Sequence, residues 1–326
     1  MLVHLSFAKH LNNRSFTTAF HSTASLIRIF AFFLTLLSAS PLIAQHLTVR
    51  ELAPGVFYYF GDEAQQKSAN CTWIVFKDYV LAIDANYPWG ADEILREIRK
   101  TSDKPVRFVF NTHYHHDHTF GNSVFVDAGA TIVSTQKTAE EMHSLGQYEW
   151  AYGTEYSGRN MNGYRREFPS LTFEQRLVFD DGIHRVELIR MGPAHTGGDG
   201  VAYLPKEKIL VTGDLCVNGN PWGNNVADED ADYDKWLSVL ETLAGWDVKL
   251  VIPGHGAPGT VETLKQQRLY LKDMLDQVRW GIQAGKTKQQ LLKEIDLSNH
   301  PVYGANTVST MRSIGFMYDK LSGKHR

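Results

Sequence analysis

Residues 113–118 read His-Tyr-His-His-Asp-His and place closely spaced imidazoles and a carboxylate in one short segment. They follow the apolar residues 106–110, which are typical of a buried β-strand. A strand that ends in a tight loop aims several side chains at one point, and hydrolytic metal sites are built in this way. The alternative is a solvated, histidine-rich turn. The position directly behind a strand favours the metal site.

Three later segments repeat the arrangement of an apolar stretch followed by a loop of small residues with a candidate ligand. Residues 186–189 precede His195, residues 208–211 precede Asp214, and residues 249–252 precede His255. The glycines in these loops let the backbone turn sharply, so that each ligand sits at a sheet edge. Taken singly, His195 or His255 would more often be a capped or core histidine. Four such loops in series favour one shared site.

Between residues 52 and 259, the ordered motifs H-x-H-x-D-H, A-H-T-G-G-D, T-G-D and P-G-H-G resemble those of the metallo-β-lactamase-fold superfamily. The resemblance implies an α/β fold, a four-layer αβ/βα sandwich with the site at the edge between two sheets. It also implies the ligands: His113, His115 and His195 for a first metal, Asp117, His118 and His255 for a second, and Asp214 as the bridging carboxylate. Asp84 resembles the family's strand-end aspartate that supports the metal loop. His116 is not used in the family pattern.

The chemistry that this resemblance implies is metal-assisted hydrolysis. Imidazole and carboxylate ligands suit two zinc ions, and also iron or manganese. A water held between two metals has a pKa lowered from about 15.7 toward about 7, so hydroxide becomes available at neutral pH. Asp117 is the candidate catalytic residue, because it would lie beside both metals and could orient the nucleophile.

The ligand pattern narrows the reaction further. The six outer ligands resemble those of subclass B3-type β-lactamases, whereas Asp214 resembles the carboxylate of glyoxalase-II-like hydrolases. Cys216 follows Asp214 by two residues and is expected to lie off the metals. We expect an exported hydrolase of a small-molecule ester, thioester, lactone or lactam. The alternatives are a true B3-like β-lactamase, a persulfide dioxygenase-like oxidoreductase with a single iron, and a non-enzymatic scaffold. The scaffold predicts lost ligands, and none is lost.

Two segments are candidates for binding the substrate. Residues 217–225 follow the bridging aspartate and contain no Lys or Arg, so Asn218 and Trp222 are read as a polar and aromatic wall. Residues 147–170 form a long stretch without clear periodicity that includes Tyr152 and Arg159. We interpret it as a lid or substrate wall, with a packing insertion as the alternative. Its arginines, Arg159, Arg165 and Arg166, could hold a substrate carboxylate.

The first 44 residues predict a signal peptide. They carry Lys9, Arg14 and Arg28 but no acid, and the apolar residues 29–37 are followed by small residues up to Ala44. The expected domains are therefore a signal peptide at 1–44, a catalytic domain at 45–259 and a helical extension at 260–326. The protein would be periplasmic or secreted, with no membrane span after processing. A retained anchor is the alternative, since Leu42 is not the small residue preferred there.

Charge and cysteine content restrict the partners. Removing residues 1–44 takes away three of the 33 basic residues and none of the 36 acidic ones, which leaves a net charge of −6. This charge argues against a nucleic acid partner. Cys71 and Cys216 are the only cysteines. Two reduced, packed thiols are the default, and a disulfide is the alternative.

Apolar spacing predicts the regular elements around these motifs. We expect a hairpin over residues 47–60 and helices over 91–101, 136–146 and 228–243, with Trp236 facing inward. The extension predicts helices over 261–282, 287–295 and about 306–321. They could pack on the sandwich, cover the pocket or form a homodimer face. His300 and Tyr303 are expected to be packing residues.

Overall fold

The computed structural model describes residues 49–61, 69–219, 231–303 and 307–323. All of them belong to one compact unit, His46–Arg326. The predicted signal peptide, its cleavage site and Trp222 lie outside the described residues. No helix in the described ranges combines the length and the apolar character needed to cross a membrane.

The first sheet contains seven strands in sequence order. They are β1 (Val49–Ala53), β2 (Val56–Tyr59), β3 (Cys71–Val75), β4 (Val80–Ile83), β5 (Val106–Phe110), β6 (Thr131–Thr135) and β7 (Leu171–Phe173). The predicted hairpin over residues 47–60 is confirmed as β1 and β2. Strands β4 to β7 pair in parallel. Their carboxyl ends therefore share one edge, where Asp84 follows β4 and the histidine-rich segment follows β5.

The second sheet has the order β13-β11-β10-β9-β8. Its strands are β8 (Arg176–Asp180), β9 (Arg185–Arg190), β10 (Gly200–Leu204), β11 (Ile209–Val211) and β13 (Leu250–Ile252). The short strands β12 (Val217–Asn218) and β14 (His255–Gly256) pair separately. Since β11 and β13 are parallel neighbours, the loops that carry Asp214 and His255 leave the sheet side by side.

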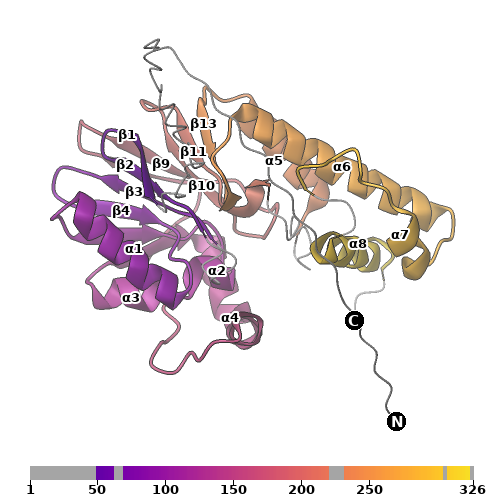
Figure 1. Cartoon of the computed structure of the whole chain (residues 1–326), viewed down its shortest axis with the longest axis horizontal. Coiled ribbons are helices and arrows are strands. Elements are labelled where there is room, and N and C mark those ends of the chain that lie inside the picture. Colours follow the sequence, from indigo (N-terminus) through magenta and orange to yellow (C-terminus); the bar gives the residue numbers. More distant parts are fainter. Residues whose placement is uncertain (1–48, 62–68, 220–230, 304–306, 324–326) are drawn as a thin grey trace, which may run out of the picture. The chain divides into compact units, whose positions relative to one another are not determined.

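The helices are α1 (Pro88–Thr101), α2 (His116–Thr119), α3 (Asn122–Asp127), α4 (Gln136–Ser157), α5 (Tyr233–Ala244), α6 (Val261–Gln283), α7 (Lys288–Glu294) and α8 (Val308–Leu321). Of these, α1 and α3 cover the outer face of the first sheet, and α5 and α6 cover that of the second (Figure 1). One apolar cluster lies between the two sheets, a second joins the first sheet to α1 and α3, and a third joins the second sheet to α5 and α6. This is the four-layer αβ/βα sandwich that the sequence predicts.

The three predicted helices of the extension are confirmed as α6, α7 and α8. They share one buried cluster with α5 and the second sheet, which includes Trp236, Leu264 and Met317. The extension therefore packs on the sandwich. Tyr303 is buried and stacks on Tyr270, and His300 lies 3.0 Å from a carboxylate oxygen of Asp273, so both are packing residues as expected.

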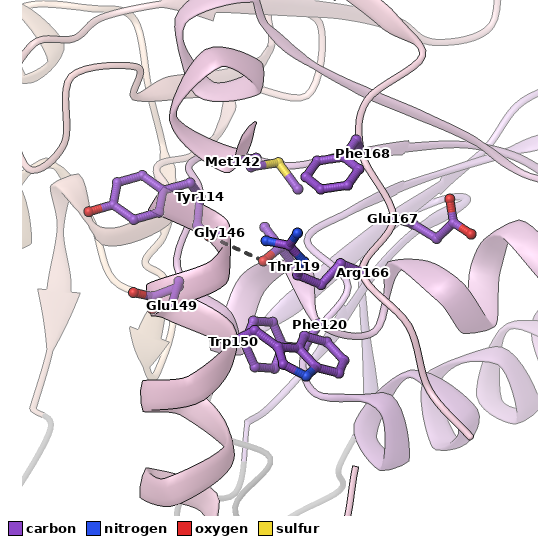
Figure 2. A pocket seen from close by; sticks show the side chains of 10 residues that line it. All are labelled: Tyr114, Thr119, Phe120, Met142, Gly146, Glu149, Trp150, Arg166, Glu167 and Phe168. Atoms are coloured by element: carbon purple, nitrogen blue, oxygen red, sulfur yellow. Dashed lines mark hydrogen bonds between the residues drawn. The ribbon is translucent and has the colours of Figure 1, made fainter. Parts of the chain in front are cut away.

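The prediction of a loop over residues 147–170 is wrong in its first part, because α4 continues to Ser157. Gly146 and Gly153 interrupt the helical pattern, since glycine is a poor helix former. Both allow close packing: a Cβ would lie 2.7 Å from Arg166 Nη1 at Gly146 and 2.6 Å from His116 Cβ at Gly153. Figure 2 shows the inner face of α4, with Trp150 against Phe120 at a small cavity of about 20 Å³.

Candidate metal centre

The histidine-rich segment is fixed to the end of β4 by Asp84. This carboxylate accepts hydrogen bonds from the backbone N–H (2.8 Å) and the hydroxyl (2.9 Å) of Thr112. One of its oxygens also lies 2.9 Å from His118 Nδ1, which orients the Nε2 atom of that ring into the site. Asp84 thus supports the loop without joining the ligands, as predicted.

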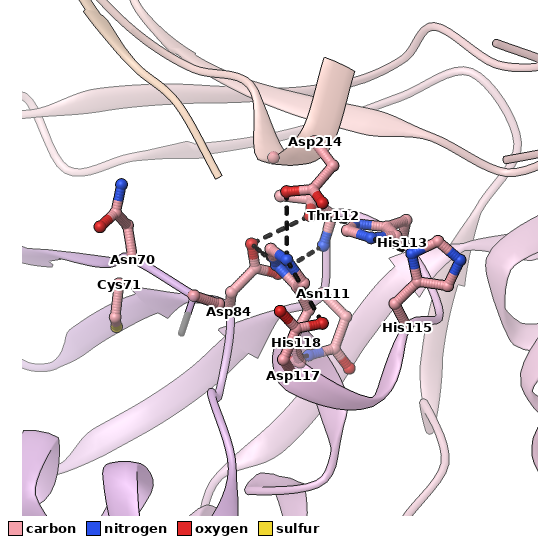
Figure 3. A network of polar contacts seen from close by, with 12 residues as sticks. Asn70, Cys71, Asp84, Asn111, Thr112, His113, His115, Asp117, His118 and Asp214 are labelled. Atoms are coloured by element: carbon pink, nitrogen blue, oxygen red, sulfur yellow. Dashed lines mark hydrogen bonds and ion pairs between the residues drawn. The ribbon is translucent and has the colours of Figure 1, made fainter. Parts of the chain in front are cut away.

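Seven side chains from four loops converge at this edge in two clusters. The first contains His113, His115, His195 and Asp214, and the second contains Asp117, His118 and His255. Within each cluster the candidate ligand atoms lie within 4.8 Å of one another. Figure 3 shows the members from the β5 loop beneath Asp214, with the support from Asp84. All seven predicted ligands are therefore brought together.

Asp214 lies between the two clusters. Its Oδ1 atom is 3.2 Å from His118 Nε2, and its Oδ2 atom is 3.3 Å from His255 Nε2 and 3.8 Å from His195 Nε2. Gly254 permits this approach, because a Cβ there would lie 1.9 Å from Asp214 Oδ1. A carboxylate that faces histidines of both clusters is placed as a bridging ligand would be.

The spacing of the donor atoms fits metal ions. A tetrahedral ion with bonds of about 2.0–2.1 Å separates its ligand atoms by about 3.3 Å. His115 Nδ1 lies 2.9 Å from His113 Nε2 and 3.1 Å from His195 Nε2. His118 Nε2 and Asp214 Oδ1 are buried and lie 3.2 Å apart. Nitrogen and oxygen donors of this kind suit zinc, iron or manganese.

The charge states of His113 and of the two carboxylates suit a metal, whereas His118 would have to release a proton to bind one. Burial would lower the pKa of His118, but the carboxylates of Asp214, Asp84 and Asp117 raise it to about 10. Burial, followed by the neighbouring imidazoles, holds the pKa of His113 well below its usual range, so this ring is neutral and can donate a lone pair. Burial would raise the pKa of Asp117, but the imidazoles of His118 and His255 hold it well below its usual range. The pKa of Asp214 is lowered in the same way, against the effect of burial. Both carboxylates are therefore ionised at neutral pH.

Asn70 holds the loop that carries His255, and the sequence did not reveal this role. The side-chain amide of this buried residue donates to the carbonyls of Pro253 (2.9 Å) and Gly256 (2.8 Å), one on each side of His255. The backbone N–H of Asn70 donates to Gly254 (2.8 Å). The Tyr58 hydroxyl adds a contact of 2.9 Å to the Gly256 carbonyl. The sequence offered one indication of this role, which is that the polar residue Asn70 directly precedes the buried strand β3.

Replacing Asn70 should weaken one metal position selectively. Asn70→Ala removes both side-chain bonds to the His255 loop, so we expect the affinity of the second cluster for a zinc ion to fall by about 10–100-fold. The first cluster, which consists mainly of histidines from other loops, should keep its affinity for zinc. Stepwise zinc titration against a chromophoric chelator measures both constants. Tyr58→Phe, which loses one contact, should have a smaller effect. An equal loss at both positions would contradict this role.

His116 lies outside both clusters, as predicted, and pairs with a residue that the sequence did not single out. The backbone N–H of His116 donates to Glu149 Oε1 (3.2 Å), and its ring Nδ1 contacts the same carboxylate oxygen. Glu149 is buried on α4. This helix therefore braces the histidine-rich segment between two of its predicted ligands, His115 and Asp117.

Three of the residues predicted to bind the substrate lie in the described part of the chain, and each has its own contacts. Asn218 lies beside the His255 strand, and its amide donates to the Ala257 carbonyl (2.8 Å). Tyr152 packs edge-on against His116, with 5.3 Å between ring centroids. The guanidinium of Arg159 lies 4.6 Å from the centre of the Trp89 ring.

The two cysteines are free and buried, so the disulfide alternative is not adopted. Burial raises the pKa of both thiols, which keeps them protonated. Neither residue belongs to a cluster of candidate metal ligands among the described residues. Cys216 therefore lies off the metal centre, as expected.

Comparison with known proteins agrees with this geometry. Residues 65–255 match the family model of the Metallo-beta-lactamase superfamily. The linear primary-alkylsulfatase of Pseudomonas sp. (strain ATCC 19151) is 25% identical over 246 residues, which cover 64% of this chain and 46% of that protein. The chain spans about half the length of the first curated relatives it matches.

Two solved structures show the same fold. The metallo-beta-lactamase from Pontibacter korlensis has a TM-score of 0.57 at 22% identity and covers 69% of this chain and 98% of its own. The stereoselective inverting sec-alkylsulfatase Pisa1 from Pseudomonas sp. has a TM-score of 0.66 at 17% identity and covers 85% of this chain and 50% of its own. The family model spans more than half of the chain. The chain therefore belongs to the metallo-beta-lactamase superfamily.

Proposed function

We propose that this protein is a zinc-dependent hydrolase that cleaves an ester, thioester, lactone or lactam bond of a small molecule with water as the nucleophile. The observation that supports this proposal is the position of Asp214 between two clusters of nitrogen and oxygen ligands. Two ions bound there would supply a water of lowered pKa and polarise the scissile bond.

The proposal gives the residues of the site two roles, metal binding and orientation of the attacking water. His113, His115 and His195 would hold the first ion, and Asp214 would serve both ions. Asp117, with His118 and His255, would hold the second ion, and its carboxylate oxygen lies 3.2 Å from His255 Nε2. Because Asp117 is ionised and buried, it can accept a hydrogen bond from the attacking water and orient it toward the substrate.

A second candidate reaction is hydrolysis of a sulfate ester. The structural match to the sec-alkylsulfatase covers 85% of this chain, against 69% for the lactamase from Pontibacter korlensis. The match to the primary alkylsulfatase supports the same candidate.

Export of the protein and a homodimer formed through the C-terminal helices stay predictions.

Metal content and turnover, measured on one sample, test the proposal. The protein is purified without added metal and assayed with a chromogenic cephalosporin, a lactone, a thioester, a 4-nitrophenyl ester and 4-nitrophenyl sulfate. We expect about two zinc ions per chain and hydrolysis of at least one substrate. About one iron per chain, no hydrolysis and oxygen consumption with a persulfide would instead indicate a dioxygenase.

Removing the metal should abolish hydrolysis without unfolding the protein. The ligands come from loops at the edge of two packed sheets, so the cores between the layers do not depend on the ions. Dialysis against a chelator should therefore leave the circular dichroism spectrum unchanged, and added zinc should restore turnover. Activity that persists in demonstrably metal-free protein would contradict the mechanism.

A further inference from the structure

Three tyrosines form a stacked stripe along α4 beside the metal centre. Tyr148, Tyr152 and Tyr156 recur every four residues, so they share one helix face. Their ring centroids are 6.3 Å and 6.0 Å apart, and neighbouring rings are close to parallel. Tyr148 is 71% exposed and Tyr156 is 54% exposed. Exposed aromatic rings that line up on one face commonly mark a binding surface.

The stripe contacts the histidine-rich segment through His116. The His116 ring lies 5.3 Å from the centroid of Tyr152 and 5.6 Å from that of Tyr156. His116 stands between the candidate ligands His115 and Asp117 in the sequence. A molecule lying on the tyrosines would therefore be adjacent to the loop that carries the metal ligands.

Arg312 brings a positive charge to this stripe from the C-terminal extension. Its Nη1 atom donates to the Tyr152 hydroxyl (2.5 Å), and its guanidinium carbon lies 5.3 Å from the centre of the Tyr152 ring. The two residues are 160 positions apart and belong to α8 and α4. Bonding to Tyr152 fixes the orientation of the guanidinium, whose fork of N–H donors matches the oxygens of carboxylate and sulfate groups.

Helix α8 is also linked, through two hydrogen bonds, to the residue before His195. The Lys320 ammonium donates to the Ala231 carbonyl (2.6 Å). The next residue, Asp232, donates its backbone N–H to Ala194 (2.8 Å), which directly precedes His195. The helix that carries Arg312 is therefore linked to the His195 loop through Ala231 and Asp232, and to α4 through Tyr152.

Other arginines near α4 are placed elsewhere. Arg165 is paired with Asp127 and Glu167. Arg166 lies over the Phe168 ring at the small cavity behind α4, as Figure 2 shows, and Arg159 lies over Trp89. The described residues show that Arg312 contacts the tyrosine stripe, at Tyr152.

We propose that the tyrosine stripe and Arg312 form the substrate-binding wall, and that this wall selects substrates in which a carboxylate or sulfate group is joined to an aromatic or apolar portion. The apolar portion would lie on the tyrosine rings and the oxyanion on the guanidinium. This inference rests on the proposed hydrolase function, because it assigns the substrate class of the same site. It also gives the C-terminal extension a part in specificity.

Ligand binding tests the wall without requiring turnover. The probe is naphthalene-2-sulfonate, and methyl 2-naphthyl sulfone is its uncharged counterpart with the same ring. Isothermal titration of the full-length, zinc-loaded protein should show at least tenfold tighter binding of the sulfonate. Arg312→Gln should weaken sulfonate binding by about 10–100-fold and leave sulfone binding within twofold. Arg312→Lys, which keeps the charge but loses the fork, should fall between these values.

Arg185→Gln is the control, since it removes an arginine that is paired with Asp180 and Glu187 on the second sheet, and it should bind both probes as the wild type does. Tyr156→Ala should weaken both probes, because the aromatic surface serves each of them. The proposal is overturned if the wild type does not prefer the sulfonate, or if Arg312→Gln changes neither probe or both equally. Thermal unfolding of each variant checks that it is folded, and Arg312→Lys provides the test if Arg312→Gln is not.

Turnover then distinguishes where the negative charge sits on the substrate. The mono-4-nitrophenyl ester of glutaric acid carries a carboxylate away from the scissile bond, 4-nitrophenyl valerate is its neutral counterpart, and 4-nitrophenyl sulfate carries the charge on the scissile group. Arg312→Gln should lower kcat/KM by about 10–100-fold for whichever anionic substrate is used and by less than twofold for the valerate. If no ester is cleaved but the binding preference holds, the proposed reaction fails while the wall stands.

Discussion

Asp117→Asn should lower kcat by about 10²–10⁴-fold while the protein keeps its fold and at least one metal ion. The amide cannot carry the negative charge that one cluster of ligands contributes, and it is a poor acceptor for the proton of an attacking water. Asp117 is 8% exposed, and its carboxylate lies close to His118 and His255. The loss of this one charge therefore acts on both the second metal and the nucleophile.

Steady-state turnover, metal content and far-ultraviolet circular dichroism measure these effects on the same sample. Asp127→Asn is a suitable control, because it neutralises an exposed aspartate that pairs with Arg165 away from the clusters. Near-normal turnover in Asp117→Asn would show that this carboxylate does not orient the nucleophile.

Trp236→Ala should destabilise the protein by about 3–5 kcal/mol, the usual cost of removing a large buried aromatic side chain. Trp236 is 0% exposed at the centre of the cluster shared by the second sheet and the C-terminal helices. Its indole N–H donates to the Leu215 carbonyl (3.0 Å), and its ring lies 5.1 Å from that of His195. The substitution should therefore also loosen the first metal position.

Equilibrium unfolding in urea measures the change in the free energy of unfolding. Trp236→Phe keeps most of the ring and loses the N–H donor, so it should cost less and remain folded if the alanine variant does not. If both variants unfolded at the same urea concentration as the wild type, the sandwich and the extension would not share a core at Trp236.

Most of the sheet and helix pattern follows from local sequence. The apolar stretches that end in glycine-containing loops became strands whose ends meet at one edge, and the extension became helices at the predicted positions. The error at α4 has a local cause, because Gly146 and Gly153 lower helix propensity and obscured a pattern that the tyrosines at every fourth position still carried. Close packing explains both glycines, because Gly153 lies against His116 of the histidine-rich segment and Gly146 lies against Arg166.

The candidate ligands could be predicted from the sequence, because ligands at strand ends lie in short motifs whose residue types are visible without the fold. The residues that support the site became apparent only in the folded protein. Asn70 reaches a loop 183–186 positions away, and Arg312 reaches Tyr152 across 160 positions. Such contacts leave no local pattern, because the residues approach each other only when the layers pack. The metal chemistry could therefore be predicted from motifs, whereas the wall that would choose the substrate could not.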